Sequence, residues 1–164
     1  MRRQFIGEIA NDEWVDRFPR DASDDDFARM SKAMEEACAR FVTGSTDPHE
    51  LHLFARKWNW DGDVAPIRAL VRNPACDQGT ALMVYWLAQP EYQLRYTSRG
   101  DVPEYEHEVF DLVSELEPRL VTGDFATAQI AYDPHADGLV SGPPANAKRA
   151  LPPEVYEPVL GQRS

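Results

Sequence analysis

The chain has 164 residues, of which 43% are hydrophobic and 27% are charged, and this composition is typical of a globular domain rather than of a disordered or fibrous chain. Its 28 acidic residues outnumber the 17 lysines and arginines, which gives a formal net charge of -11. We therefore expect neither nucleic acid nor an anionic membrane surface as a partner, because both attract basic surfaces.

The apolar stretches are too short for a membrane span, and the cysteines are few. The longest apolar run is Ala81–Ala88, whereas a spanning helix needs about 20 residues. Glu8 follows the N-terminal arginines before any apolar stretch forms, so we expect no signal peptide. Cys38 and Cys76 do not form a Cys-x-x-Cys pair, and we expect two buried free thiols in a cytoplasmic protein.

The first strong helix signal begins at Ser23, after a mixed segment in which residues 4–9 have the pattern of a short strand. Ser23 and Asp26 have the spacing of a capping box. Apolar residues then recur at helical spacing up to Phe41, and Gly44 is expected to cap the C-terminus of this helix.

Three further helices are predicted before Pro90. Asp47 caps a helix that ends near residue 59, a shorter helix covers residues 65–72, and Asp77 caps a helix through residues 81–88. The last of these helices is apolar on every side, so we expect it to lie at the centre of the fold. The stretch 60–63 has the composition of a turn.

A fifth helix is predicted from Pro103, with an end or a kink at Pro118, and residues 127–132 have the pattern of a short strand. From Pro134 onward the chain is rich in proline, and we predict an extended tail that either lies on the domain or is disordered. The predicted fold is mainly α: a compact bundle of about five helices, with room for a short strand or two, and a proline-rich C-terminal tail. The chain is divided into an N-terminal segment with the first helix (1–46), a helical domain (47–132) and the tail (133–164).

A series of short motifs in the helical domain resembles a known bacterial family. The motifs are Leu51-His52-Leu53-Phe54-Ala55, Asn59-Trp60-Asp61-Gly62, Asn73-Pro74-Ala75-Cys76-Asp77-Gln78-Gly79-Thr80-Ala81-Leu82 and Tyr85-Trp86-Leu87. Together they resemble DUF4274, a bacterial domain of unknown function, over roughly residues 47–132. The resemblance implies a domain boundary but no catalytic residue, because the family has no established activity.

The turn after the second helix is a candidate ligand site. Asn59, Asp61 and Asp63 bring oxygen atoms near Gly62, but the spacing and the closing glutamate of an EF-hand calcium loop are lacking. The alternative is a tight connector whose Asn and Asp side chains cap neighbouring backbone groups. If the protein binds a small molecule, the predicted site consists of Trp58, Asn59, Trp60 and Asp61.

Signals for a metal, a cofactor or a catalytic group are weak. His49 and His52 have the i, i+3 spacing of metal ligands, and Asp61 or Asp63 is a candidate third ligand, but no Glu-x-x-His motif or cysteine ligand supports a zinc site. The sequence has no Gly-x-Ser-x-Gly elbow, no phosphate-binding glycine loop and no cysteine in a thiolate-stabilising context. We therefore predict no metal and no cofactor, name no catalytic residue, and favour a non-enzymatic role.

The segment from Asp101 to Glu117 contains seven acidic residues and no lysine or arginine. Four of these acids follow helical spacing and would form one exposed row on a helix, which we call the acidic row: Glu104, Glu108, Asp111 and Glu115. Such a row is either a solvated face or a docking face for a basic protein.

The leading hypothesis is a cytoplasmic protein-binding protein that docks a basic partner through the acidic row. Its concrete form is an immunity protein that neutralises a basic toxin by imitating the charge of the toxin's substrate. One alternative is a small enzyme or ligand-binding domain with its pocket near Trp58, Trp60 and Asp61. Another is a structural module of a larger assembly. The sequence leaves the oligomeric state open.

Overall fold

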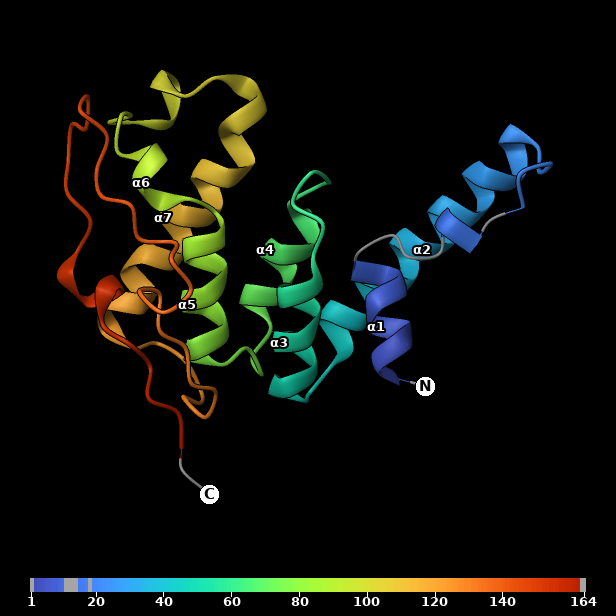
Figure 1. Ribbon diagram of the computed structural model, residues 1–164, viewed down its shortest axis with the longest axis horizontal. Coiled ribbons are helices and arrows are strands. Elements are labelled where there is room, and N and C mark those ends of the chain that lie inside the picture. The colour runs from blue at the N-terminus through green and yellow to red at the C-terminus, as the bar shows by residue number, and fades with distance from the viewer. Residues whose placement is uncertain (1, 11–14, 18, 163–164) are drawn as a thin grey trace. The chain divides into compact units, whose positions relative to one another are not determined.

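The computed structural model describes residues 2–10, 15–17 and 19–162. These residues contain seven α-helices and four short 3-10 helices, which confirms the prediction of a mainly α protein (Figure 1). The chain divides into two compact units, Met1–Ala75 and Cys76–Ser164, which we call unit 1 and unit 2.

Unit 1 contains the first four α-helices. Helix α1 packs against α3, and α2 packs against α4. Residues 4–9 are helical rather than extended: Ile6 and Ile9 are both buried, and a spacing of three places both side chains on one face of a helix but on opposite faces of a strand. The elements are α1 (Arg2–Ala10), η1 (Val15–Arg17), α2 (Asp24–Gly44), α3 (Pro48–Lys57) and α4 (Ala65–Arg72).

The predicted N-caps of unit 1 are confirmed, but the predicted C-cap is wrong. The Ser23 hydroxyl accepts a hydrogen bond from the Asp26 amide at 3.2 Å, which completes a capping box, and Asp47 accepts one from the His49 amide at 2.9 Å. Gly44 is instead the last residue of α2, and Ser45 follows it in an extended conformation. No left-handed glycine is therefore needed at this helix end.

The ends of α2 and α4 are joined through Asn73, which is 7% exposed. Its side-chain amide donates to the carbonyl oxygens of Val42 at 2.8 Å and Ser45 at 3.0 Å. Its side-chain oxygen accepts from the Ala75 amide at 2.8 Å. A buried amide with these partners fixes the position of α4 against α2.

Unit 2 is built around α5, whose residues 79–86 are all buried, as its apolar sequence predicts. Helix α7 packs along α5 (Figure 1). The fifth predicted helix begins at His107 rather than Pro103, and it passes Pro118 and ends at Thr122, before the left-handed Gly123. The elements are α5 (Gln78–Leu87), α6 (Pro90–Gln93), η2 (Arg99–Asp101), η3 (Glu104–Glu106), α7 (His107–Thr122) and η4 (Pro153–Tyr156).

Asp77, which is fully buried, ties residues 127–130 to the start of α5. Its carboxylate accepts from the Gly79 amide at 2.9 Å, which confirms the predicted cap, and also from the Thr127 hydroxyl at 2.7 Å and the Gln129 amide at 2.6 Å. The prediction of a strand over 127–132 is wrong, because these donors turn to Asp77 instead of to a neighbouring strand. A single antiparallel bridge, Tyr132 with Val159, is the β pairing found in the described part of the chain.

The proline-rich tail lies on unit 2 and runs beside α5 and α7 (Figure 1). The Trp86 indole donates to the Val155 carbonyl at 2.8 Å, and Val155 is fully buried. The Glu91 carboxylate, also buried, accepts from the Ser141 hydroxyl at 2.7 Å and the Gly142 amide at 2.8 Å. Of the two predicted states of the tail, the structure therefore has the one that lies on the domain.

Candidate functional site

A cavity of about 570 Å³ lies within unit 1, between α2, the connector from α3 to α4, and α4 itself. Trp58 and Asn59, two of the four residues predicted to bind a ligand, line it, whereas Trp60 and Asp61 are not among its described lining residues. The described lining residues are Ile9, Ser31, Met34, Glu35, Cys38, Ala39, Val42, Thr43, Trp58, Asn59, Gly62, Asp63, Ala65, Pro66 and Ala69.

The connector at the cavity is held by its own polar groups, as the alternative reading of this segment predicts. The Asn59 amide donates to the Ala10 carbonyl at 2.8 Å, and the Asn59 side chain accepts from the Asp61 amide at 3.1 Å. Asp63 accepts from the Ala65 amide at 2.8 Å and so begins α4. The turn predicted over 60–63 is confirmed. These bonds position Trp58 and Asn59 at the wall of the cavity.

Trp58 is fixed by a stack of three aromatic rings inside unit 1. Phe41 stacks on Phe54, and Phe54 stacks on Trp58, with 5.4 Å between ring centroids in both pairs. The Trp58 indole nitrogen is shielded from solvent and has no acceptor among the described residues. A buried donor without an acceptor costs about 1–3 kcal/mol, so this indole is not optimised for stability alone.

The charges at the cavity are of one sign. Glu35 and Asp63 contribute carboxylates, and no lysine, arginine or histidine occurs among the described lining residues. Both carboxylates are exposed to solvent, whereas the apolar wall contains buried side chains such as Cys38 and Val42. The cavity thus has an apolar inner part and an acidic edge.

The acidic row is not continuous in the structure. Glu104 lies in η3, outside α7, because the helix begins four residues later than predicted. Glu104 and Glu108 are exposed, but Asp111 accepts a hydrogen bond from the Arg99 guanidinium at 3.0 Å and Glu115 is half-buried. Two of the four carboxylates are therefore placed as predicted on the surface, and a third is neutralised by an arginine of unit 2.

A group of aromatic residues that sequence reasoning missed lies close to Glu104; we call it the tyrosine cluster, and it consists of Tyr92, Tyr96 and Tyr105. The hydroxyls of Tyr92 and Tyr96 donate to Glu106 at 3.3 and 3.2 Å. Tyr105 is 84% exposed, and the neighbouring Glu106 carboxylate raises its pKa. Three tyrosines within fourteen residues were the available sequence signal.

The Arg95 guanidinium stacks over the Tyr92 ring at 3.3 Å from the ring centroid. This cation–π contact and the bond from the Tyr92 hydroxyl to Glu106 hold the Tyr92 ring in place, and Tyr96 donates to the same carboxylate. The surface around Tyr105 is therefore preorganised, and it combines exposed aromatic area with the acids Glu104 and Glu108.

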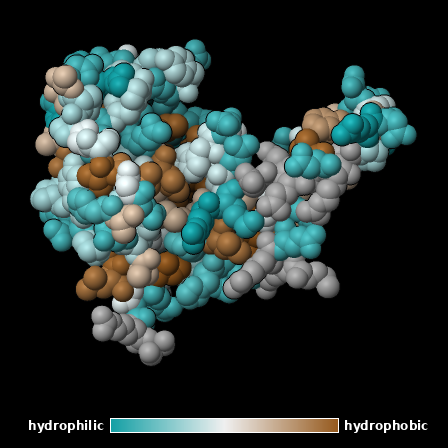
Figure 2. All heavy atoms as spheres, in the orientation of Figure 1, coloured by the Kyte–Doolittle hydropathy of each residue, from teal (hydrophilic) through white to brown (hydrophobic). Residues whose placement is uncertain are grey.

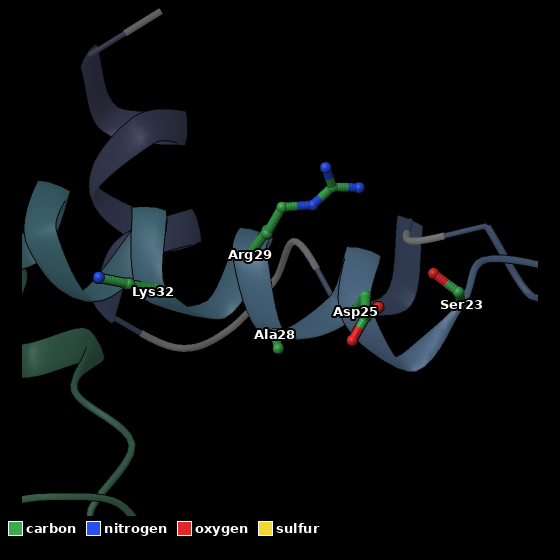
Figure 3. A pocket seen from close by; sticks show the side chains of 5 residues that line it. All are labelled: Ser23, Asp25, Ala28, Arg29 and Lys32. Carbon is green, nitrogen blue, oxygen red and sulfur yellow. The ribbon is translucent and has the colours of Figure 1, made fainter.

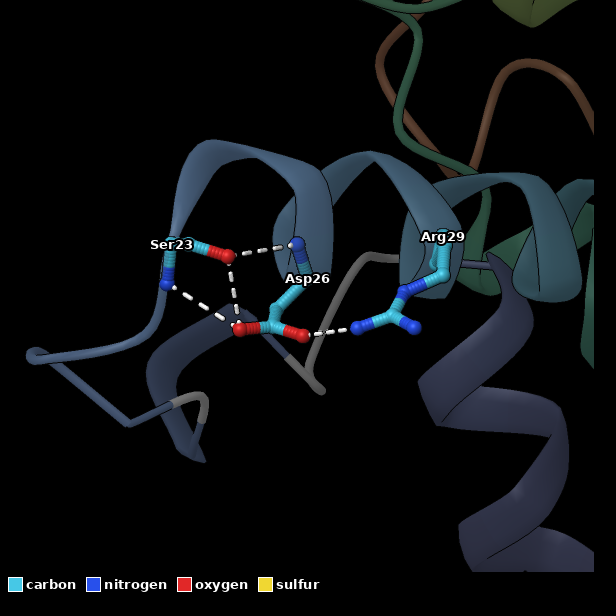
Figure 4. Close-up of polar contacts among 3 residues, drawn as sticks. All are labelled: Ser23, Asp26 and Arg29. Carbon is cyan, nitrogen blue, oxygen red and sulfur yellow. Dashed lines mark hydrogen bonds and ion pairs between the residues drawn. The ribbon is translucent and has the colours of Figure 1, made fainter.

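The N-terminal part of α2 has a shallow depression, whose described lining residues are the N-cap Ser23 and four residues of the helix, Asp25, Ala28, Arg29 and Lys32 (Figure 3). Figure 4 shows that Arg29 there pairs with Asp26, whose carboxylate also accepts from Ser23. The Ser23 hydrogen bonds and the Arg29 guanidinium lower the pKa of Asp26. Because Asp26 already pairs with Arg29 and bonds to the N-cap Ser23, the described part of the depression offers no polar group that is arranged for a ligand.

Hydrophobic residues are also visible on the surface of this N-terminal part of α2 (Figure 2). Phe27 and Met30 are 44% and 41% exposed there. Exposed apolar side chains on one helix do not by themselves define a ligand site, so they add no candidate.

No three His, Cys, Asp or Glu side chains in residues 2–10, 15–17 and 19–162 come together in a way that could hold a metal ion, and His49 and His52 remain on α3 without a third ligand. In the same part of the chain, no helix is long and apolar enough to cross a membrane.

Comparison with known proteins confirms the family resemblance. The model of DUF4274, a domain of unknown function, matches residues 46–121. No curated protein and no solved structure matches the chain. The matched segment contains α3 to α6 and nearly all of α7, so it includes Trp58, Asn59 and the tyrosine cluster. It excludes α2, which contributes one wall of the cavity.

Proposed function

We propose that the chain is a ligand-binding protein and that the cavity in unit 1 is its binding site. The observation that carries the proposal is a cavity of about 570 Å³ that is walled by α2, Trp58 and α4. Its volume lies in the range of sites for small organic molecules.

The lining has the composition that such sites have. Most of the wall is apolar, from residues such as Met34, Val42 and Pro66, and a few polar groups stand among them. Asn59 and Asp63 are already fixed by backbone hydrogen bonds, so a ligand would meet a preformed edge. This arrangement supports binding more directly than it supports catalysis.

The proposal is tested by filling the cavity from an exposed position. Ala39 lines the cavity on α2, and Ala33 lies on the same helix outside the described lining; both are exposed. We expect Ala39→Leu to abolish thermal stabilisation by any small molecule that stabilises the wild-type protein in a screen, whereas Ala33→Leu leaves it unchanged. Equal responses of both variants would contradict the proposed site.

Docking of a basic protein is a second candidate, and its concrete form is an immunity protein that neutralises a basic toxin. Its support is the surface of Tyr105, which is 84% exposed, together with exposed Glu104 and Glu108. Tyrosine and arginine are enriched at the centres of protein interfaces, and complementary charge accelerates encounter. The revised docking surface contains Tyr105, Glu104 and Glu108, and no longer depends on Asp111.

The docking candidate is tested by co-purification with the product of the adjacent gene. The Glu104→Lys/Glu108→Lys double variant and Tyr105→Ala are each expected to weaken the complex at least about 10-fold. Glu157→Lys, which changes an exposed acid elsewhere in unit 2, is the matched control. Binding that is unchanged in the first two variants would remove this candidate.

A cytoplasmic location is part of the proposal. Cys38 and Cys76 are both buried free cysteines. Free thiols are typical of proteins in reducing compartments, where disulfides do not persist. Export of a fusion to an oxidising compartment, followed by mass spectrometry of Cys38 and Cys76, would test whether both stay reduced only in the cytoplasm.

A further inference from the structure

The cavity in unit 1 combines three chemical features that together select a class of ligand. It has an apolar wall, an aromatic side chain at Trp58, and two carboxylates at its edge, Glu35 and Asp63. None of the described lining residues is a lysine, an arginine or a histidine. Arg40 of α2 pairs with Glu36 at 3.6 Å and is not among the described lining residues.

We infer that the ligand of this cavity is an organic cation, an ammonium or guanidinium group attached to an apolar body. The inference rests on the proposed ligand-binding function of the same cavity. The apolar body would be buried against Met34, Val42 and Pro66, where it loses contact with water. The cationic end would remain at the edge, near Glu35 and Asp63.

The two carboxylates are suited to binding a cation because hydrogen bonds within the protein do not occupy all of their acceptor oxygens. Asp63 uses one oxygen to accept from the Ala65 amide at 2.8 Å, and this bond holds the carboxylate at the edge of the cavity. Both Glu35 and Asp63 are exposed, so a cation can approach them without losing all of its hydration. The same two carboxylates would repel an anionic ligand of equal shape.

Trp58 adds to the preference for a cation. Indole is the best aromatic partner for a cation, and Phe54 stacks on this ring and keeps it in place. The Trp58 indole nitrogen is shielded and has no acceptor among the described residues. Because the ring lines the cavity, ligand binding beside it is expected to alter tryptophan fluorescence.

The experiment uses three probes of one shape on the full chain: 2-phenylethylammonium, the neutral 2-phenylethanol and the anionic phenylacetate. Dissociation constants are measured by calorimetry, with the change in tryptophan fluorescence as a second readout. We expect the ammonium to bind at least about 10-fold more tightly than the alcohol, and the carboxylate most weakly. The preference is expected to decrease as salt is added.

Neutralising variants locate the charge effect. Glu35→Gln and Asp63→Asn are each expected to weaken binding of the ammonium about 3-fold and to leave binding of the alcohol unchanged. Asn at 63 keeps an oxygen for the Ala65 amide, so the start of α4 is preserved. The matched controls are Glu36→Gln and Asp61→Asn, neighbouring acids that are not among the described lining residues.

The outcomes separate the inference from the function on which it rests. Equal binding of all three probes, abolished by Ala39→Leu, would overturn the cation preference and leave the ligand site intact. Binding of the ammonium that is equally weakened by Glu36→Gln and Asp61→Asn would also overturn the inference, because it would reflect the net charge of the chain. Failure of all three probes to bind the wild-type protein would overturn the inference. The proposed ligand-binding function would then be tested separately, by the thermal-stabilisation screen that compares Ala39→Leu with Ala33→Leu.

Discussion

Unit 2 and unit 1 use their buried space in different ways. In unit 2, the buried carboxylates of Asp77 and Glu91 are surrounded by backbone and hydroxyl donors from segments distant in the sequence. In unit 1, a cavity of about 570 Å³ remains between α2 and α4, and the indole nitrogen of Trp58 has no acceptor among the described residues. These buried carboxylates of unit 2 therefore serve its fold, whereas the cavity of unit 1 is the space that we propose for a ligand.

The largest expected effect is the loss of Asp77. Asp77→Ala leaves the Thr127 hydroxyl and the Gln129 amide without their acceptor, and we expect the free energy of unfolding to fall by about 3–5 kcal/mol. Urea denaturation followed by circular dichroism measures the change. Asp61→Ala, at an exposed turn of unit 1, is the control and should cost less than about 0.5 kcal/mol. Similar losses in the two variants would break the contrast between the units.

One substitution made in both units should have opposite effects. At Gly79 of unit 2, an added Cβ would lie 2.0 Å from the Ile130 carbonyl oxygen, so Gly79→Ala is expected to cost about 1–3 kcal/mol. At Gly44 of unit 1, an added Cβ meets nothing within 4 Å in a helical residue, and Gly44→Ala should stabilise by up to about 1 kcal/mol. Thermal unfolding of the two variants measures the two changes in stability. A Gly44→Ala variant that is less stable than the wild-type protein would contradict the predicted opposite effects.

Much of this contrast could be predicted from the sequence, because it depends on local signals. Ser23, Asp47 and Asp77 cap their helices as their residue types predict, and α4 occupies residues 65–72 as expected. The central position of α5 followed from its apolar residues on every side. Local patterns failed at residues 4–9 and 127–132, where packing of Ile6 and hydrogen bonds to Asp77 decide the conformation.

The candidate sites were less predictable, because they depend on contacts between distant segments. The cavity joins Ile9 to residues of α2 and α4, and no local pattern indicates that these segments leave a space between them. The acidic row was predicted from a segment without basic residues, but Arg99, just before it, bonds to Asp111. The ligand site was predicted from an indole and a carboxylate at a turn. Of its four residues, Trp58 and Asn59 line the cavity, whereas Trp60 and Asp61 are not among its described lining residues.

The smallest expected effect on stability is at the cavity itself. Ala39 is exposed on α2, so Ala39→Leu should change the free energy of unfolding by less than about 0.5 kcal/mol while it occupies cavity space. Ala33→Leu, on the same helix, should have the same small effect on stability. A loss of several kcal/mol in Ala39→Leu alone would mean that the side chain enters a closed core rather than an open site.

The most direct test of the cavity compares the reactivity of the two thiols. Cys38 lines the cavity, whereas burial raises the pKa of Cys76 in unit 2 to about 12. At pH 8 almost all of the Cys76 thiol is therefore protonated, and we expect it to react slowly with alkylating reagents. The pH at which Cys76 reacts is expected to lie well above that of an exposed thiol.

The measurement is the rate at which a small thiol reagent labels each cysteine at pH 8, followed by mass spectrometry of the intact native protein and its peptides. We predict that Cys38 is labelled faster than Cys76, that Ala39→Leu slows the labelling of Cys38, and that Ala33→Leu does not. Labelling of Cys38 that is as slow as that of Cys76, or that is unaffected by Ala39→Leu, would contradict an open cavity in unit 1.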